Sequence, residues 1–120
     1  MTDILTPFLS VIRIEMQKAA HDASEKLLTD YFDGVDRGAC GFAWVTIYPK
    51  HKGNTKLGKA ERREFEQLGA RKDWTGKAWM IWNPANYPVQ SVDVLEAGAR
   101  AAAMFLQRYG YDAVAGSRLD

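Results

Sequence analysis

The sequence contains few of the cysteines and histidines that cross-link small proteins or bind metal ions in them. Its 120 residues include a single cysteine, Cys40, and two histidines, His21 and His51. One cysteine excludes an internal disulfide, and because Cys40 lies in an apolar run we expect a buried free thiol in a reducing compartment. Neither histidine has a second ligand at metal spacing, so we predict no metal site and no cofactor.

Long apolar runs and local catalytic motifs are also missing. No run approaches the roughly 18 residues that a membrane-spanning helix needs, and Asp3 stands where a secretory signal would carry Lys or Arg. We therefore expect a cytoplasmic protein without membrane contact. H-E-x-x-H and G-x-S-x-G are absent, so no catalytic residue is predicted. An acid-base site assembled from scattered residues would leave no such motif, which keeps an enzyme among the alternatives.

What is present is the composition of one folded domain. Hydrophobic residues make up 47% and charged residues 26%, as in ordinary globular proteins, and the length fits a single domain over residues 1–120. The net charge of +1 conceals an uneven distribution, because residues 50–77 hold nine basic and four acidic side chains while residues 1–37 hold four and seven. The middle of the chain is expected to face an anionic partner.

Residues 6–32 are predicted to form a long amphipathic helix. Thr6 and Pro7 suit an N-cap and a first helical position, and residues 33–38 break the helix with two glycines. Apolar residues recur every three or four positions and define the expected buried stripe: Phe8, Ile12, Met16, Ala19, Ala23 and Leu27. Residues 39–120 then form the α+β core.

Two apolar strands are predicted in the middle of the chain. Residues 39–48 are apolar at both parities, which indicates a strand covered on both faces with Trp44 inside, and Pro49 stops it. Residues 77–82 form the other strand, with Trp79 inside. Between them lies a helix over residues 56–68, ended by Gly69, whose inward residues are expected to be Leu57, Ala60, Phe65 and Leu68.

The last helix begins near Ser91 or Asp93 and runs to Tyr109, with Glu96 placed to complete a capping box if Asp93 is the cap. Its glycine and alanine run permits close approach to a sheet. The expected buried stripe is Leu95, Gly98, Ala99, Ala102, Phe105, Leu106 and Tyr109. Residues 112–116 make a short third strand. The fold class is therefore α+β, in the order α-β-α-β-α-β, with three helices on a small, about three-stranded, largely antiparallel sheet.

Residues 53–60 nearly match the phosphate-binding loop GxxxxGK[ST], but Ala60 replaces the hydroxyl that would hold Mg²⁺. The mismatch argues against nucleotide hydrolysis. A glycine-rich basic loop at a helix N-terminus still attracts anions through free amides and Lys59.

Two tryptophans and two arginines complete the candidate surface. Trp74 in a polar loop and Trp82 at a strand end either stack on a flat ligand or close the edges of the core. Arg100 either pairs with Glu96 or joins Arg118 as an anion clamp, although residues 117–120 also read as a frayed tail. The predicted ligand-binding residues are Asn54, Lys59, Lys72, Trp74, Trp82, Asn83, Arg100 and Arg118.

Four segments, CGFAWV, RKDWTGKAWMIWNP, QSVDVLEAGARA and GSRLD, resemble a family of small proteins encoded by tailed phages and prophages. The resemblance covers residues 39–120. It implies a viral, phage accessory protein of the host bacterial cytoplasm and carries over no catalytic residue. Such proteins often inhibit a host defence complex, sequester a nucleotide or assist DNA metabolism.

The leading hypothesis is a non-enzymatic protein that binds an anionic partner, either a nucleotide-like small molecule or a nucleic-acid-related surface. It requires loops 50–56 and 70–76 to converge with the C-terminal arginines. The alternatives are a module that grips a host protein, or a homo-oligomer, through Phe8, Ile12 and Met16 of the first helix, and a small enzyme acting on a phosphorylated substrate.

Overall fold

The computed structural model describes residues 6–120 and confirms the α+β class. Its elements are α1 (Thr6–Phe32), β1 (Gly41–Tyr48), α2 (Lys56–Gln67), β2 (Arg71–Lys72), β3 (Trp79–Trp82), α3 (Val92–Arg108) and β4 (Asp112–Leu119). The four strands form one antiparallel sheet in the order β2-β3-β1-β4. The fourth strand is β2, which the sequence analysis assigned to a loop because its two residues are too few to show alternation.

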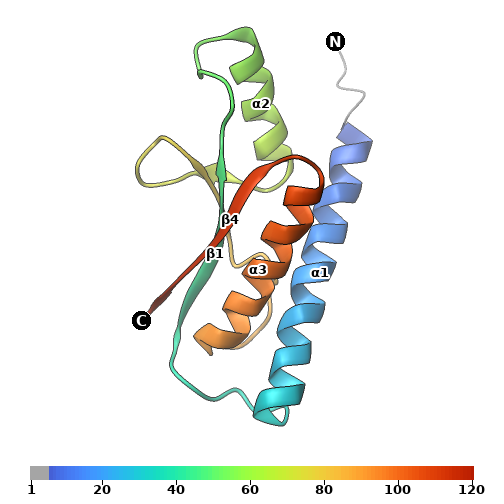
Figure 1. Cartoon of the computed structure of the whole chain (residues 1–120), viewed down its shortest axis with the longest axis vertical. Coiled ribbons are helices and arrows are strands. Elements are labelled where there is room, and N and C mark those ends of the chain that lie inside the picture. Colours follow the sequence, from blue (N-terminus) through green and yellow to red (C-terminus); the bar gives the residue numbers. More distant parts are fainter. Residues whose placement is uncertain (1–5) are drawn as a thin grey trace.

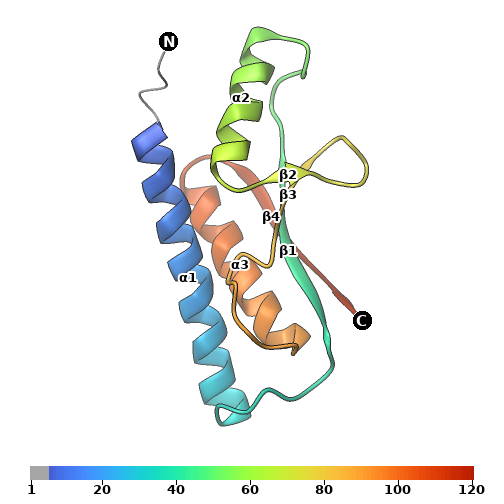
Figure 2. The ribbon, with the colours of Figure 1, turned by 180° about the vertical axis from the view of Figure 1, so that it is seen from behind.

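The helices cover only one face of this sheet (Figures 1 and 2). In β1, Ala43, Val45 and Ile47 are buried against the helices, whereas Phe42 and Trp44 point to the opposite face and are partly exposed. The prediction of a strand covered on both faces was therefore wrong, and Trp44 is not a core residue. Trp79 is buried as expected.

The buried face of α1 differs from the predicted stripe. Ile12 and Met16 are buried, but Phe8 is 52% exposed, and the later turns bury Ala20, Ser24 and Leu28 instead of Ala19, Ala23 and Leu27. Ser24 faces inward because its hydroxyl donates a 2.7 Å hydrogen bond to the Val94 carbonyl of α3. The cap predicted at Thr6 and Pro7 depends on side chains outside the described part of the chain.

The small residues of α3 allow close approach, but the glycine faces α1 rather than the sheet. An ideal Cβ on Gly98 would lie 2.5 Å from Ser24 Oγ and 2.7 Å from Ala85 Cβ. The N-cap of α3 is Ser91, without a side-chain cap bond. Glu96 makes no capping box, because it accepts from Ser117 and pairs with Arg100.

Four more side chains expected inside lie at the surface, among them Ala60, which falls on the solvent side of α2. Cys40 is exposed and its thiol donates to Gln90 Oε1 at 3.5 Å; Leu57 and Tyr109 are exposed as well. Residues 117–119 are not a frayed tail, because β4 continues to Leu119 in register with β1. No helix within residues 6–120 combines the length and the hydropathy needed to cross a membrane.

Candidate functional site

A chain of three open hollows follows the β2 edge of the sheet, and we call it the β2-edge groove. The first, about 390 Å³, lies between residues 49–53, α2 and the β2–β3 hairpin. The second, about 520 Å³, lies over Arg71, Met80 and Trp82. The third, about 630 Å³, lies between α1 and residues 82–86. Lys72 lines the first and second hollows, and Trp82 lines the second and third, so neighbouring hollows share a side chain.

The lining of the groove is strongly cationic. Among residues 6–120 one carboxylate, that of the half-buried Glu61, lines the groove. It already accepts hydrogen bonds from the backbone amides of Lys50 (2.9 Å) and His51 (3.1 Å), and lies 3.6 Å from His51 Nδ1. The positive side chains number seven: Arg13, Lys18, Lys52, Arg62, Arg71, Lys72 and Lys77. A hollow lined by one sign of charge attracts and holds anions.

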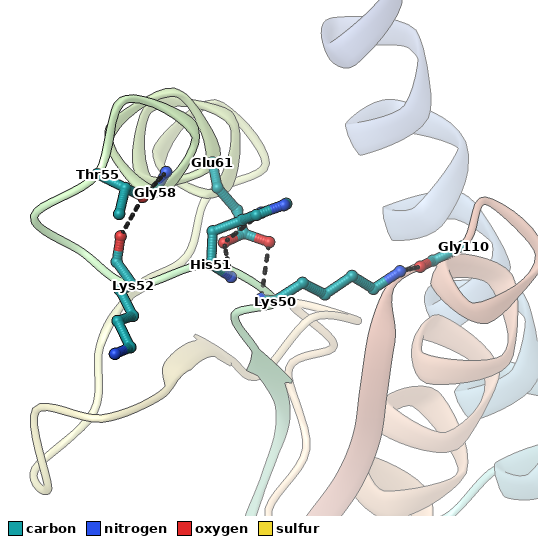
Figure 3. A network of polar contacts seen from close by, with 7 residues as sticks. All are labelled: Lys50, His51, Lys52, Thr55, Gly58, Glu61 and Gly110. Carbon is teal, nitrogen blue, oxygen red and sulfur yellow. Dashed lines mark hydrogen bonds and ion pairs between the residues drawn. The ribbon is translucent and has the colours of Figure 1, made fainter.

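Loop 50–55 is fixed against α2 by short polar contacts (Figure 3). Besides the bonds that Glu61 accepts, the Thr55 hydroxyl donates to the Lys52 carbonyl (2.6 Å) and accepts from the Gly58 amide (3.0 Å) as the N-cap of α2. The Lys59 amide bonds to the Thr55 carbonyl. The Gly58 and Lys59 amides are therefore bonded within the protein and are not offered to a phosphate.

The β2–β3 hairpin positions cations on both sides of its turn. Asp73 Oδ1 accepts from the amide (3.0 Å) and the hydroxyl (2.6 Å) of Thr75. These bonds hold the pKa of Asp73 below its ordinary value of 3.8, and the bond from the Thr75 hydroxyl has the largest effect. The turn places Lys72 and Lys77 in the first hollow. Trp74, at the turn, is 89% exposed.

An aromatic surface occupies the open side of the sheet beside the groove. The rings of Trp44 and Trp82 are parallel, with centroids 5.8 Å apart, and Phe42 lies 5.4 Å from Trp82. The guanidinium of Arg118 lies 5.5 Å above the Phe42 ring. We call Phe42, Trp44 and Trp82 the aromatic face. Because Trp82 also lines two hollows of the groove, the cationic and aromatic surfaces meet at this residue.

The structure brings some of the predicted site residues together and separates others. Lys72, Trp82 and Asn83 line the β2-edge groove. Trp74 stands exposed on the hairpin beside it, and Arg118 lies on the aromatic face. Asn54 and Lys59 are exposed but line none of its hollows, and Arg100 pairs with Glu96 on α3.

The expected convergence is therefore half right. Residues from loops 50–56 and 70–76 meet in the first hollow. The C-terminal arginines do not join them, because Arg118 pairs with Phe42 at the start of β1 whereas loop 50–56 follows the end of that strand. Phe42 and the last residue of β1, Tyr48, are six positions apart, about 20 Å of extended chain.

Sequence reasoning missed part of the groove and most of the aromatic face. Arg13 and Lys18 lie outside the predicted buried stripe, in a segment with more acidic than basic residues, and Arg71 was assigned to a loop. Phe42 and Trp44 were assigned to the core, although they occupy alternate positions and so share one face of the strand. That alternation was the signal in the sequence that could have identified Phe42 and Trp44 as residues of an open face.

One group of side chains has the spacing of metal ligands. The ligand atoms of His21, Asp22 and Glu25 lie within 4.8 Å of one another, so His21 does have neighbouring ligands, contrary to expectation. All three side chains are exposed on α1, and we assign them no function.

Comparison with family models, with curated proteins and with solved structures found no match to this chain. The resemblance to phage-encoded proteins stays an expectation. The arrangement itself supports non-covalent recognition of phosphate charge in the groove and of flat rings on the adjoining face.

Proposed function

We propose that this protein binds single-stranded nucleic acid along the β2-edge groove, with bases stacked on the aromatic face. The observation that carries the proposal is the meeting of the two surfaces at Trp82. Sequence-tolerant single-strand binding combines a positive groove for the backbone with aromatic rings for the bases, each stacked base contributing about 1–3 kcal/mol. A duplex keeps its bases stacked inside and would use only the groove.

A polymer suits this surface better than a mononucleotide. The positive side chains are spread over three neighbouring hollows rather than gathered at one point. All three are open to solvent, whereas small-molecule sites bury most of the ligand surface. A nucleotide-like ligand would engage one hollow and leave the others without a partner.

The alternatives draw less support from the geometry. A partner protein cannot grip Ile12 or Met16, because both are buried in the core, which leaves Phe8 of the predicted helix stripe. Arg100, which an enzyme acting on a phosphorylated substrate would use to bind the phosphate, is engaged by Glu96. The resemblance to phage proteins implies that the proposed binding of nucleic acid occurs in a host bacterial cytoplasm, in replication or in counter-defence.

The proposal is tested by titrating a short oligothymidylate against the protein and following tryptophan fluorescence at several salt concentrations. Arg71→Ala with Lys72→Ala removes two groove cations, so we expect affinity to fall about tenfold and the slope of log affinity against log salt to become shallower by about 1.4. Lys26→Ala with Arg108→Ala makes the same change in net charge away from the groove and should leave both values close to wild type.

Two results would contradict the proposal. Equal losses from the groove variant and the control would show a general charge effect rather than a site. Equal affinity for thymidine monophosphate and for the oligomer would show a small-molecule site instead of a polymer track.

A further inference from the structure

The outer edge of β4 is an eight-residue strand edge without a neighbour. β4 is the last strand in the sheet order, and no strand within residues 6–120 lies beyond it. The Asp120 amide bonds to the Cys40 carbonyl on the β1 side. Because backbone groups alternate in direction along a strand, the even-numbered residues of β4 face β1 and the odd-numbered residues, Ala113 to Leu119, face outward.

This edge carries few of the features that natural proteins use to prevent strand pairing. Exposed edges are usually protected by proline, by charged residues or by a covering element. Between Asp112 and Arg118 the strand reads Ala-Val-Ala-Gly-Ser. The Gln107 amide donates to the Ala113 carbonyl at 2.8 Å, and a carbonyl with two lone pairs can still accept a second bond.

We propose that a second copy of this chain pairs with β4, antiparallel and with the two-fold axis at Ala115. To hydrogen-bond, the outward-facing residues of one β4 strand must lie opposite the outward-facing residues of the other. In a symmetric antiparallel pair this places the two-fold axis at a residue and not between two residues. Centring on Ala115 sets Asp112 opposite Arg118 of the partner subunit, twice per dimer. Both positions lie on the open face of the sheet, since Asp112 opposes Tyr48 and Arg118 opposes Phe42 of β1.

Charge complementarity selects this register. Centring on the next residue, Gly116, would set Arg118 against the uncharged Val114 and leave Asp112 beyond the paired segment. Opposite charges directly across an antiparallel pair are stabilising, and like charges are destabilising. Pairing two four-stranded sheets in this way joins the two open faces into one, so that the aromatic face of one protomer continues onto the other.

The proposal is independent of nucleic-acid binding and is tested by sedimentation equilibrium of the ligand-free protein over a wide concentration range. We expect a reversible wild-type dimer. Asp112→Arg should raise its dissociation constant about tenfold, and adding Arg118→Asp to that variant should restore it. Ala115→Pro, which removes one outward amide but none that faces β1, should abolish the dimer, whereas Ala115→Ser should retain it.

A wild-type chain that stays monomeric would overturn the proposal. So would a dimer that survives Ala115→Pro in a variant with native circular dichroism, because its interface would lie elsewhere. A dimer that responds equally to Asp112→Arg and to the double charge reversal would exclude the proposed register.

Discussion

The indole of Trp44 lies against the backbone of Gly116 in the neighbouring strand. An ideal Cβ on Gly116 would come within 2.6 Å of Trp44 Nε1 and 2.7 Å of Cε2. Because residue 116 is glycine, the Trp44 indole can pack against the backbone of β4, where it stacks with Trp82. The aromatic face therefore depends on a residue without a side chain.

Gly116→Ala should displace the Trp44 ring and lower the free energy of unfolding by about 1–3 kcal/mol, because the added methyl group overlaps the indole. Near-ultraviolet circular dichroism should change along with the stability measured in urea. A double-mutant cycle with Trp44→Leu provides the control. If Gly116→Ala is equally damaging without the indole, the contact is not the reason for the glycine.

Gly58→Ala should destabilise the protein although alanine is the better helix former. The added Cβ would lie 1.9 Å from the Lys52 carbonyl oxygen, so loop 50–55 would have to move off α2. We expect a loss of about 1–3 kcal/mol in chemical unfolding. Gly53→Ala is the matched control, because a Cβ there meets nothing within 4 Å, and a gain in stability for Gly58→Ala would refute the packing argument.

Gly98→Ala tests the contact between α1 and α3. Its Cβ would overlap Ser24 Oγ, the donor of the buried bond to Val94, and Ala85. We expect a melting temperature several degrees lower, consistent with about 1–3 kcal/mol of overpacking. Adding Ser24→Ala should recover part of the loss by making room. No recovery would mean that the crowding comes from Ala85 or from the α1 backbone.

The Asp73 carboxyl should titrate below its ordinary value of 3.8, because its ionised form accepts the Thr75 hydroxyl and nearby amides. A lowered pKa in the folded state means that the stabilisation is present above pH 3.8 and is lost as the pH falls through the folded value. Thr75→Val should move the pKa up toward 3.8, as measured by carboxyl carbon NMR. An unchanged pKa would show that the hydroxyl bond is not its main cause.

The sequence predicted the longer elements well because their signals are local. Periodicity located α1, α2 and α3, and Pro49 and Gly69 ended their elements where expected. Two-residue β2 was missed because no pattern exists at that length. The end of β4 was missed because Ser117 and Arg118 are polar, and they are strand residues only through their pairing with β1.

The site was harder to predict because it depends on which face of the sheet is covered. An apolar run such as β1 has the same sequence whether one face or both are buried. Phe42 and Trp44 therefore looked like core residues until α3 was seen to cover only the side of Val45 and Ile47. Likewise, Arg13 joins the groove only because α1 packs beside residues 82–86, a contact that no local pattern records.

Nucleic-acid binding at the aromatic face is tested by following the indole N–H signals of the four tryptophans, assigned by single substitutions to phenylalanine, during addition of a single-stranded oligonucleotide. We predict that the signals of Trp82 and Trp44 shift most and that of buried Trp79 least. Binding without any shift of Trp82, or with changes confined to the helical side of the molecule, would contradict stacking of bases on the aromatic face.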